Sequence, residues 1–186
     1  MPRTTLQVII RKLPILIMWN DTDTPLAYFI SFRSYGTWLH GDNRGSTDRF
    51  HNEYGAPFIP PNEKWKRYKQ DLLKTRPLIL NANQRQAVES TIRETCQIIQ
   101  WALWAINVRT NHVHTVVTAN RKPGLVLNAF KANATRELRE RGLWRYGFSP
   151  WADKGSKKKL WNERSVQRAI DYVLFGQGDD LPDFDD

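Results

Sequence analysis

Two hydrophobic periodicities alternate along this chain and divide it into strands and helices. Aromatic and β-branched residues predict strands over residues 26–33, 101–108 and 112–118. Apolar residues spaced three and four positions apart are typical of amphipathic helices, and they predict helices over residues 83–100, 125–141 and 163–175. This order indicates an α+β fold in which helices pack on one or both faces of an antiparallel sheet.

The segments between these elements lack a clear period. Residues 41–78 carry prolines at positions 57, 60, 61 and 77, and we expect an irregular insertion there rather than a separate domain. A chain of 186 residues has the length of one domain. The expected organisation is an N-terminal extension over 1–20, a single domain over 21–178 and an acidic tail over 179–186.

The distribution of charge indicates a polyanionic partner. The whole chain has a net charge of +9. Five of its 19 acidic residues are aspartates within the last eight positions, so residues 1–178 combine 28 basic with 14 acidic side chains. A body this basic is typical of nucleic-acid-binding proteins. A generic solubilising surface is the alternative, although such surfaces usually mix the two signs more evenly.

The cysteine content and the apolar stretches bear on disulfides, membrane contact and cellular location. Cys96 is the single cysteine, so an internal disulfide is impossible. It lies on the apolar stripe of the helix over 83–100 and is expected to be a core residue rather than a nucleophile. The apolar stretch over 13–19 is too short to span a bilayer. We therefore expect no membrane partner and a cytoplasmic, nucleoid-associated location.

Two histidines on one predicted strand are the first candidate for chemistry. Side chains along a strand alternate between its faces, so His112 and His114 share a face about 7 Å apart. One divalent cation can bridge two imidazoles at this spacing. A simple exposed polar face is the alternative. His40 and His51 are isolated in the irregular segment, where histidines are more often bystanders.

A tyrosine on the last predicted helix is the second candidate. At about 100° per residue, Val166, Ile170 and Val173 form the buried stripe of this helix. Tyr172 falls roughly 120° from the centre of that stripe, so it can present its hydroxyl to a cleft. Arg168 lies one turn earlier and would favour a phosphate or a phenolate. An amphipathic tyrosine at the edge of the core is the alternative.

Basic and aromatic residues interleave over residues 143–162, which lack a regular period. This mixture suits single-stranded nucleic acid, because cations follow the backbone while rings stack on unpaired bases. The candidate contacts are Lys154, Lys157, Lys158 and Lys159. The alternative is that the tryptophans of this segment close the core and only the lysines are exposed.

Three segments resemble the single-tyrosine HUH transposases, which include small insertion-sequence transposases and the REP-associated tyrosine transposases. These segments are Asn-His-Val-His-Thr over 111–115, the helix that contains Lys131, and residues 160–173 with Tyr172. The resemblance covers roughly residues 26–178. It implies a ferredoxin-like sandwich whose antiparallel sheet carries the histidine strand, with the single domain over 21–178 as an HUH-type catalytic domain.

The resemblance also implies roles for individual residues. His112 and His114 would bind Mg²⁺ or Mn²⁺, and imidazole ligands favour Mn²⁺ of the two. Tyr172 would be the nucleophile that forms a covalent bond to the 5′ phosphate of single-stranded DNA, often beside a hairpin. Lys131 would contact DNA or phosphate, and a surface lysine that extends its amine into water is the equal alternative.

The chain departs from the family pattern at one ligand position. Many members carry a third polar ligand four residues after the tyrosine, and here that position is Gly176, which has no side chain. Gln177 could reach the metal if the helix ends at Gly176. Glu163 and Asp171 are weaker candidates for the third ligand.

We expect a metal-dependent DNA transposase or endonuclease that cleaves and rejoins single strands through a covalent phosphotyrosine. The first alternative is a domesticated, non-catalytic protein that binds single-stranded or hairpin DNA. A histidine phosphoesterase with paired His-x-Ser or His-x-Thr motifs is disfavoured, because no histidine of this chain has that spacing. The family includes monomers and domain-exchanging dimers, so either a monomer or a homodimer is expected.

Overall fold

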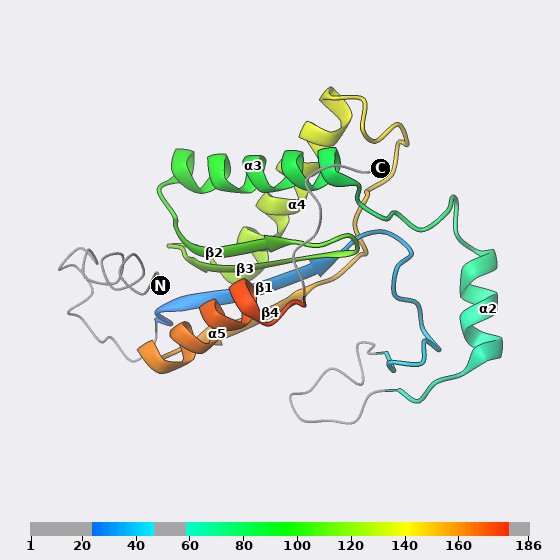
Figure 1. Cartoon of the computed structure of the whole chain (residues 1–186), viewed down its shortest axis with the longest axis horizontal. Coiled ribbons are helices and arrows are strands. Elements are labelled where there is room, and N and C mark those ends of the chain that lie inside the picture. The colour runs from blue at the N-terminus through cyan, green and yellow to red at the C-terminus, as the bar shows by residue number, and fades with distance from the viewer. Residues whose placement is uncertain (1–23, 47–58, 179–186) are drawn as a thin grey trace.

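Four antiparallel strands form the sheet at the centre of the molecule (Figure 1). The strands are β1 (Ala27–Arg33), β2 (Ala102–Val108), β3 (His112–Thr118) and β4 (Ser156–Leu160). They lie in the order β2-β3-β1-β4, and the chain runs β1-α3-β2-β3-α4-β4 through the sheet and two helices. This is the ferredoxin-like arrangement, so the expected fold class is confirmed.

This computed structural model describes residues 24–46 and 59–178. The expected N-terminal extension over 1–20, the acidic tail over 179–186 and His51 lie outside the described residues. Within them, no helix is both long enough and apolar enough to cross a bilayer.

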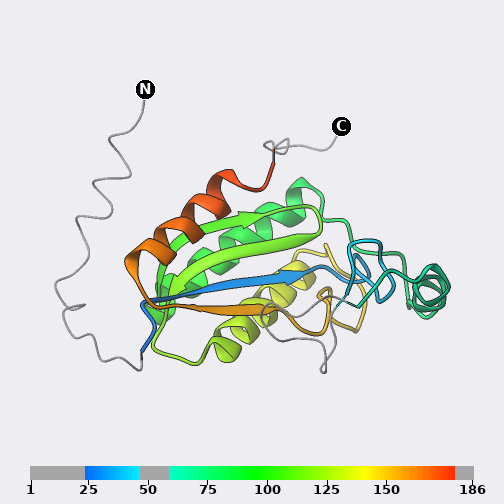
Figure 2. The same cartoon turned by 90° about the horizontal axis from the view of Figure 1, so that it is seen from below.

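Two helices cover one face of the sheet and a third covers the other (Figures 1 and 2). Helices α3 (Ala82–Ile99) and α4 (Pro123–Glu140) bury the larger apolar core, in which Phe130 and Ile92 pack with Phe32 of β1. Helix α5 (Glu163–Phe175) lies on the opposite face. The predicted helices and strands agree with these bounds to within two residues, as expected where apolar periods are regular.

A second, smaller core holds α5 on its face of the sheet. Ile170 and Val173 of the helix pack with Val116, Ala105 and Leu160. Because this core is small, polar residues of the same sheet face remain outside it, at the end where α5 finishes. The α5 face of the sheet therefore carries polar side chains as well as this core.

Local capping explains where the helices begin. Asn81 caps α3 by accepting a hydrogen bond from the Gln84 amide, and the Gln84 side chain accepts one from the Asn81 amide in return. Asn162 caps α5 by accepting a hydrogen bond from the Ser165 amide. Helix α5 ends at Gly176.

The segment over 41–78 is not wholly irregular, which corrects the sequence-based expectation. It contains α2 (Glu63–Asp71), which buries none of its residues and so has no apolar stripe to reveal it. Asn62 caps this helix and donates its amide to the Gly41 carbonyl. Gly41 has φ +87°, and a side chain there would collide with the Asn62 carbonyl. Figure 1 shows α2 standing away from the sheet.

The segment over 143–162 also contains an element that the sequence pattern did not predict. Strand β4 pairs with the outer edge of β1, from Ala27 opposite Leu160 to Ser31 opposite Ser156. Its three lysines have low strand propensity, so only the free edge of β1 makes this segment extended. Lysines on an edge strand also discourage pairing with other chains. Trp144 and Trp151 close the larger core, whereas Trp161 is exposed.

Candidate functional site

The two predicted histidines lie together on the α5 face of the sheet. In the register of β3 with β1, His112 stands opposite Arg33 and His114 opposite Ser31. Residues opposite one another in antiparallel strands share a face. The two imidazole ring centroids are 4.7 Å apart, so the alternation read from the sequence brings them into contact.

Amide groups on both sides fix the His112 ring. Its Nδ1 lies 2.6 Å from Asn111 Oδ1, and its Nε2 lies 3.1 Å from Gln177 Oε1. Burial lowers the pKa of His112, the Gln177 contact raises it, and the positive charges of Arg33, Arg109 and Arg44 lower it further. A neutral imidazole that donates Nδ1–H to Asn111 keeps its lone pair on Nε2. That lone pair then faces the Gln177 oxygen, and a cation could be shared by the two atoms.

The second histidine has a buried nitrogen with no partner. Among the described residues, His114 Nδ1 is the buried side-chain atom that lacks a hydrogen-bond partner. The His114 ring stacks on Phe29, with ring centroids 5.3 Å apart. Burial, with smaller contributions from His112 and Arg33, lowers the pKa of His114 to about 3. A neutral imidazole with an unpaired buried nitrogen is a suitable metal ligand.

Tyr172 comes to the same place from α5. Its ring centroid is 5.7 Å from that of His114 and 5.9 Å from that of Phe29, both in edge-on contact. The side chain is 48% exposed, so the tyrosine lies outside the buried stripe, as its helical angle indicates. The histidines and the tyrosine therefore meet within one chain.

The end of α5 explains how a glutamine can stand in for the missing side chain at position 176. A Cβ on Gly176 would press against the ring and the carbonyl of Tyr172. The chain turns here instead, and Gln177 Nε2 donates to the Tyr172 carbonyl at 3.2 Å while its Oε1 faces His112. Among the described residues, no three His, Cys, Asp or Glu side chains gather as a metal site. Glu163 and Asp171 therefore do not join the histidine pair.

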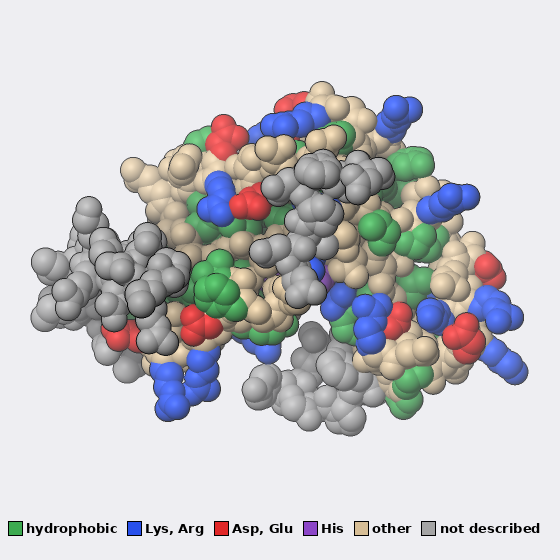
Figure 3. Space-filling model, viewed as in Figure 1, with side chains coloured by type: hydrophobic (Ala, Val, Ile, Leu, Met, Phe, Trp, Pro, Cys, Tyr) green, Lys and Arg blue, Asp and Glu red, His purple; other side chains and the backbone are tan. Residues whose placement is uncertain are grey.

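Arginine brings positive charge to the site from a position that the sequence analysis did not name. Arg33, at the end of β1, interacts electrostatically with Tyr172. The predicted Arg168 is exposed on α5. The strand pattern of residues 26–33 contains Arg33, yet only the pairing of β1 with β3 brings it beside His112. In Figure 3 a histidine surface lies next to Lys and Arg side chains, with further basic side chains toward the α2 side.

Lys131 lies in the other layer of the molecule, on α4. Its Nζ donates to the carbonyl oxygens of Ala152, Asp153 and Lys154 at 2.7, 3.2 and 2.8 Å. An ammonium group has three donors, so all of them are engaged with the backbone that leads into β4. Burial lowers the pKa of Lys131 to about 8. A contact of Lys131 with DNA would require its ammonium group to break one of these three hydrogen bonds.

The predicted lysine cluster is divided between the two faces of the sheet. Lys158 stands opposite Phe29, so it shares the histidine face, whereas Lys157 and Lys159 stand opposite Ile30 and Tyr28 on the other face. Lys154 is exposed before the strand begins. Strand alternation was missed here because residues 143–162 were expected to be irregular.

His40 is occupied away from the site. Its ring stacks on Trp65 of α2 with ring centroids 4.8 Å apart, and its Nδ1 lies 3.2 Å from Ser46 Oγ. This agrees with its interpretation as a bystander.

Comparisons with known proteins give a family match and several similar solved structures. The sequence model of the IS200-like transposases matches residues 72–164, half of the chain. One similar structure is a REP-associated tyrosine transposase bound to a REP hairpin, with a TM-score of 0.46 and 12% identity over 82% of this chain and 67% of that chain. Another is the crystal structure of a candidate transposase from Deinococcus radiodurans R1, with a TM-score of 0.46 and 12% identity over 81% of this chain and 89% of that chain. A search of curated proteins gives no match.

Proposed function

The chain belongs to the family of IS200-like transposases, and on that premise we propose that it cleaves and rejoins single-stranded DNA through Tyr172. One observation carries the proposal. His112 and His114 of β3 converge on one face of the sheet with two residues about sixty positions later in the sequence, Tyr172 of α5 and Gln177, which follows that helix. The last two of these residues lie beyond the matched range of 72–164.

The donor atoms fit a divalent cation. His112 Nε2, the His114 imidazole and Gln177 Oε1 are neutral nitrogen and oxygen donors, and His114 Nδ1 has no other partner. This donor set suits Mn²⁺ somewhat better than Mg²⁺. When bound, the cation supplies positive charge to a phosphate oxygen.

The protein residues account for the chemical step. Tyr172 Oη forms a bond to phosphorus as the bond between phosphorus and the 3′ oxygen breaks, and the bonding pair stays on that oxygen. The phenol proton passes to solvent, and the departing 3′ oxygen takes up a proton from solvent. The reverse reaction on another 3′ hydroxyl rejoins strands without ATP. Arg33 interacts electrostatically with Tyr172 and so adds positive charge beside the nucleophile.

We extend the proposal to single-stranded DNA beside a hairpin, bound by the domain over 21–178 in the nucleoid. The excess of basic over acidic side chains in residues 1–178 supports a DNA partner. The candidate contacts on the histidine face are Lys158 and Arg33. Lys154 and Arg168 are also exposed, and we include them among the candidate DNA contacts.

The test is the formation of a covalent adduct. The purified chain is incubated with Mn²⁺ and oligonucleotides that carry a hairpin, a randomised single-stranded flank and a 3′-terminal label, since the 3′ fragment stays on the enzyme. We expect an SDS-resistant adduct that EDTA prevents, and a DNA-modified peptide that contains Tyr172.

Tyr172→Phe removes only the nucleophilic oxygen, so adduct formation should disappear while DNA binding is kept. Tyr68→Phe is the matched control, because Tyr68 is 58% exposed on α2. An adduct formed by Tyr172→Phe, or mapped to another tyrosine, contradicts the proposal.

A domesticated DNA-binding protein without turnover is the second candidate. The glycine at position 176, where many family members carry a metal ligand, favours it. This candidate predicts hairpin binding without an adduct at any Mn²⁺ concentration.

A further inference from the structure

Arg33 lies at the site together with the two histidines and the tyrosine, and the proposed chemical step leaves its binding role open. It is the last residue of β1, opposite His112 in the strand register and on the same face. Its charge lowers the pKa of both histidines, and the Tyr172 phenol raises the pKa of Arg33. The Arg33 guanidinium therefore lies within electrostatic reach of the metal-ligand candidates and of the nucleophile.

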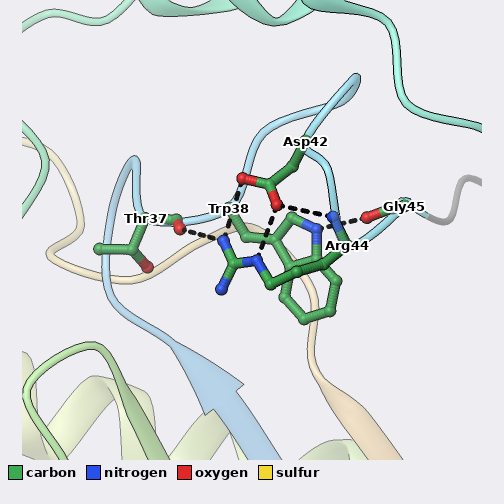
Figure 4. Close-up of polar contacts among 5 residues, drawn as sticks. All are labelled: Thr37, Trp38, Asp42, Arg44 and Gly45. Atoms are coloured by element: carbon green, nitrogen blue, oxygen red, sulfur yellow. Dashed lines mark hydrogen bonds and ion pairs between the residues drawn. The ribbon is translucent and has the colours of Figure 1, made fainter.

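An aromatic ring holds this guanidinium in place. Arg33 Cζ lies 3.5 Å from the centroid of the Trp38 ring, which is a close cation–π contact. Trp38 is itself fixed, because its Nε1 donates to the Gly45 carbonyl at 2.6 Å. Figure 4 shows Arg44 lying across the same indole, and Arg44 Cζ is 4.7 Å from the ring centroid.

The two arginines on Trp38 differ in their partners. Arg44 Nε and Nη2 donate to the two carboxylate oxygens of Asp42, and Nη2 also donates to the Thr37 carbonyl (Figure 4). Within residues 24–46 and 59–178, the Arg33 guanidinium has no hydrogen-bond acceptor or ion-pair partner; besides the cation–π contact, the longer-range electrostatic influence of Asp42 and Tyr172 raises its pKa. Burial lowers its pKa to about 10, and a guanidinium stays protonated well below that value.

A partly buried cation with no anion in hydrogen-bond contact carries a desolvation cost that a directly bound anion would offset. The guanidinium fork matches a phosphate in geometry, since two parallel N–H donors can reach two oxygens. At this position the available phosphate is the one that Tyr172 attacks.

We propose that Arg33, oriented by Trp38, binds the non-bridging oxygens of the scissile phosphate and stabilises the charge that develops on them during attack by Tyr172. This inference rests on the proposed function. Arg33 keeps all its protons throughout, so the bonds that form and break are those of the tyrosine attack alone. Trp38 is a positioning residue that acts through Arg33. Both residues lie outside residues 72–164, which match the sequence model of the family.

Single-turnover adduct formation at saturating oligonucleotide tests the proposal. Arg33→Ala should lower the rate about 100-fold or more, as for loss of a donor that stabilises transition-state charge. Arg33→Lys keeps the positive charge but lacks the two parallel N–H donors, so its rate should lie between those of the wild type and Arg33→Ala. Arg93→Ala is the matched control, because Arg93 is an exposed arginine of α3 paired with Glu89 in the opposite layer. It should retain the wild-type rate.

A second measurement separates a phosphate contact from a folding defect. The cleavage position found with the wild-type protein defines the scissile phosphate, which is then replaced with a neutral methylphosphonate. If Arg33 binds this phosphate, removal of its charge should shrink the Arg33→Ala deficit to less than about tenfold, since the two changes delete the same interaction. A methylphosphonate one nucleotide away should leave the deficit unchanged.

The outcomes are distinguishable. A wild-type protein that forms no Tyr172 adduct overturns the proposed function and this inference together. A wild-type adduct with an unchanged Arg33→Ala rate overturns only the inference. The inference alone is also overturned if the Arg33→Ala rate deficit is not reduced by a methylphosphonate at any position. The same holds if only a methylphosphonate next to the scissile phosphate reduces that deficit.

Discussion

At the scale of single residues, Gln177 is the side chain whose role depends most on its neighbours. Its amide oxygen faces His112 Nε2 while its amide nitrogen donates to the Tyr172 carbonyl. The same glutamine thus connects one metal-ligand candidate with the backbone of the proposed nucleophile. The sequence offers Gln177 only as the residue after Gly176, and its contacts with His112 and Tyr172 come from the tertiary structure.

Gln177→Ala should raise the Mn²⁺ concentration needed for half-maximal adduct formation roughly tenfold or more, because the variant lacks one oxygen donor. Glu163→Gln and Asp171→Asn are the controls, since neither carboxylate joins the histidine pair. Titration of adduct yield against Mn²⁺ measures the effect. A shift caused by Asp171→Asn and not by Gln177→Ala would move the third ligand to the carboxylate.

At the scale of elements, strand β4 divides three consecutive lysines between the two faces of the sheet. Its alternation directs Lys158 to the histidine face and Lys157 and Lys159 to the other. A DNA strand that lies across the site can therefore meet one of the three directly.

Lys158→Gln should weaken binding of a single-stranded oligonucleotide more than Lys157→Gln or Lys159→Gln. For each phosphate that a variant no longer neutralises, the slope of log affinity against log salt should decrease in magnitude by about 0.7. Binding measured at several salt concentrations gives this slope for each variant. Equal effects of the three substitutions would mean that DNA follows the edge of β4 and not the histidine face.

At the scale of the whole molecule, one chain supplies every group of the proposed site. The second core buries α5 on the sheet of its own chain, with Val173 fully buried and Tyr172 in contact with His114. A domain-exchanged dimer would instead combine the histidines of one chain with the tyrosine of another.

A mixture of His112→Ala and Tyr172→Phe proteins, unfolded and refolded together, should form no adduct. Each site within a single chain lacks one essential group, whereas an exchanged heterodimer would contain one intact site. Adduct formation by each single variant alone provides the baseline. Activity that appears only in the mixture would show that α5 is exchanged between chains.

The sequence by itself determined the features that depend on local spacing. Strand alternation aligned His112 with His114, and the apolar stripe of α5 left Tyr172 on its flank. The α+β order follows from the same short-range periods. The sequence offered Gln177 as a ligand on the condition that the helix ends at Gly176, and α5 ends there.

Only the tertiary structure decided the contacts between residues far apart in the chain. The register of β1 with β3 placed Arg33 beside His112, and the free edge of β1 made a lysine-rich segment into β4. Three backbone carbonyls that meet only after packing engage Lys131. No local period encodes such pairings, because each depends on how separate elements align when the core forms.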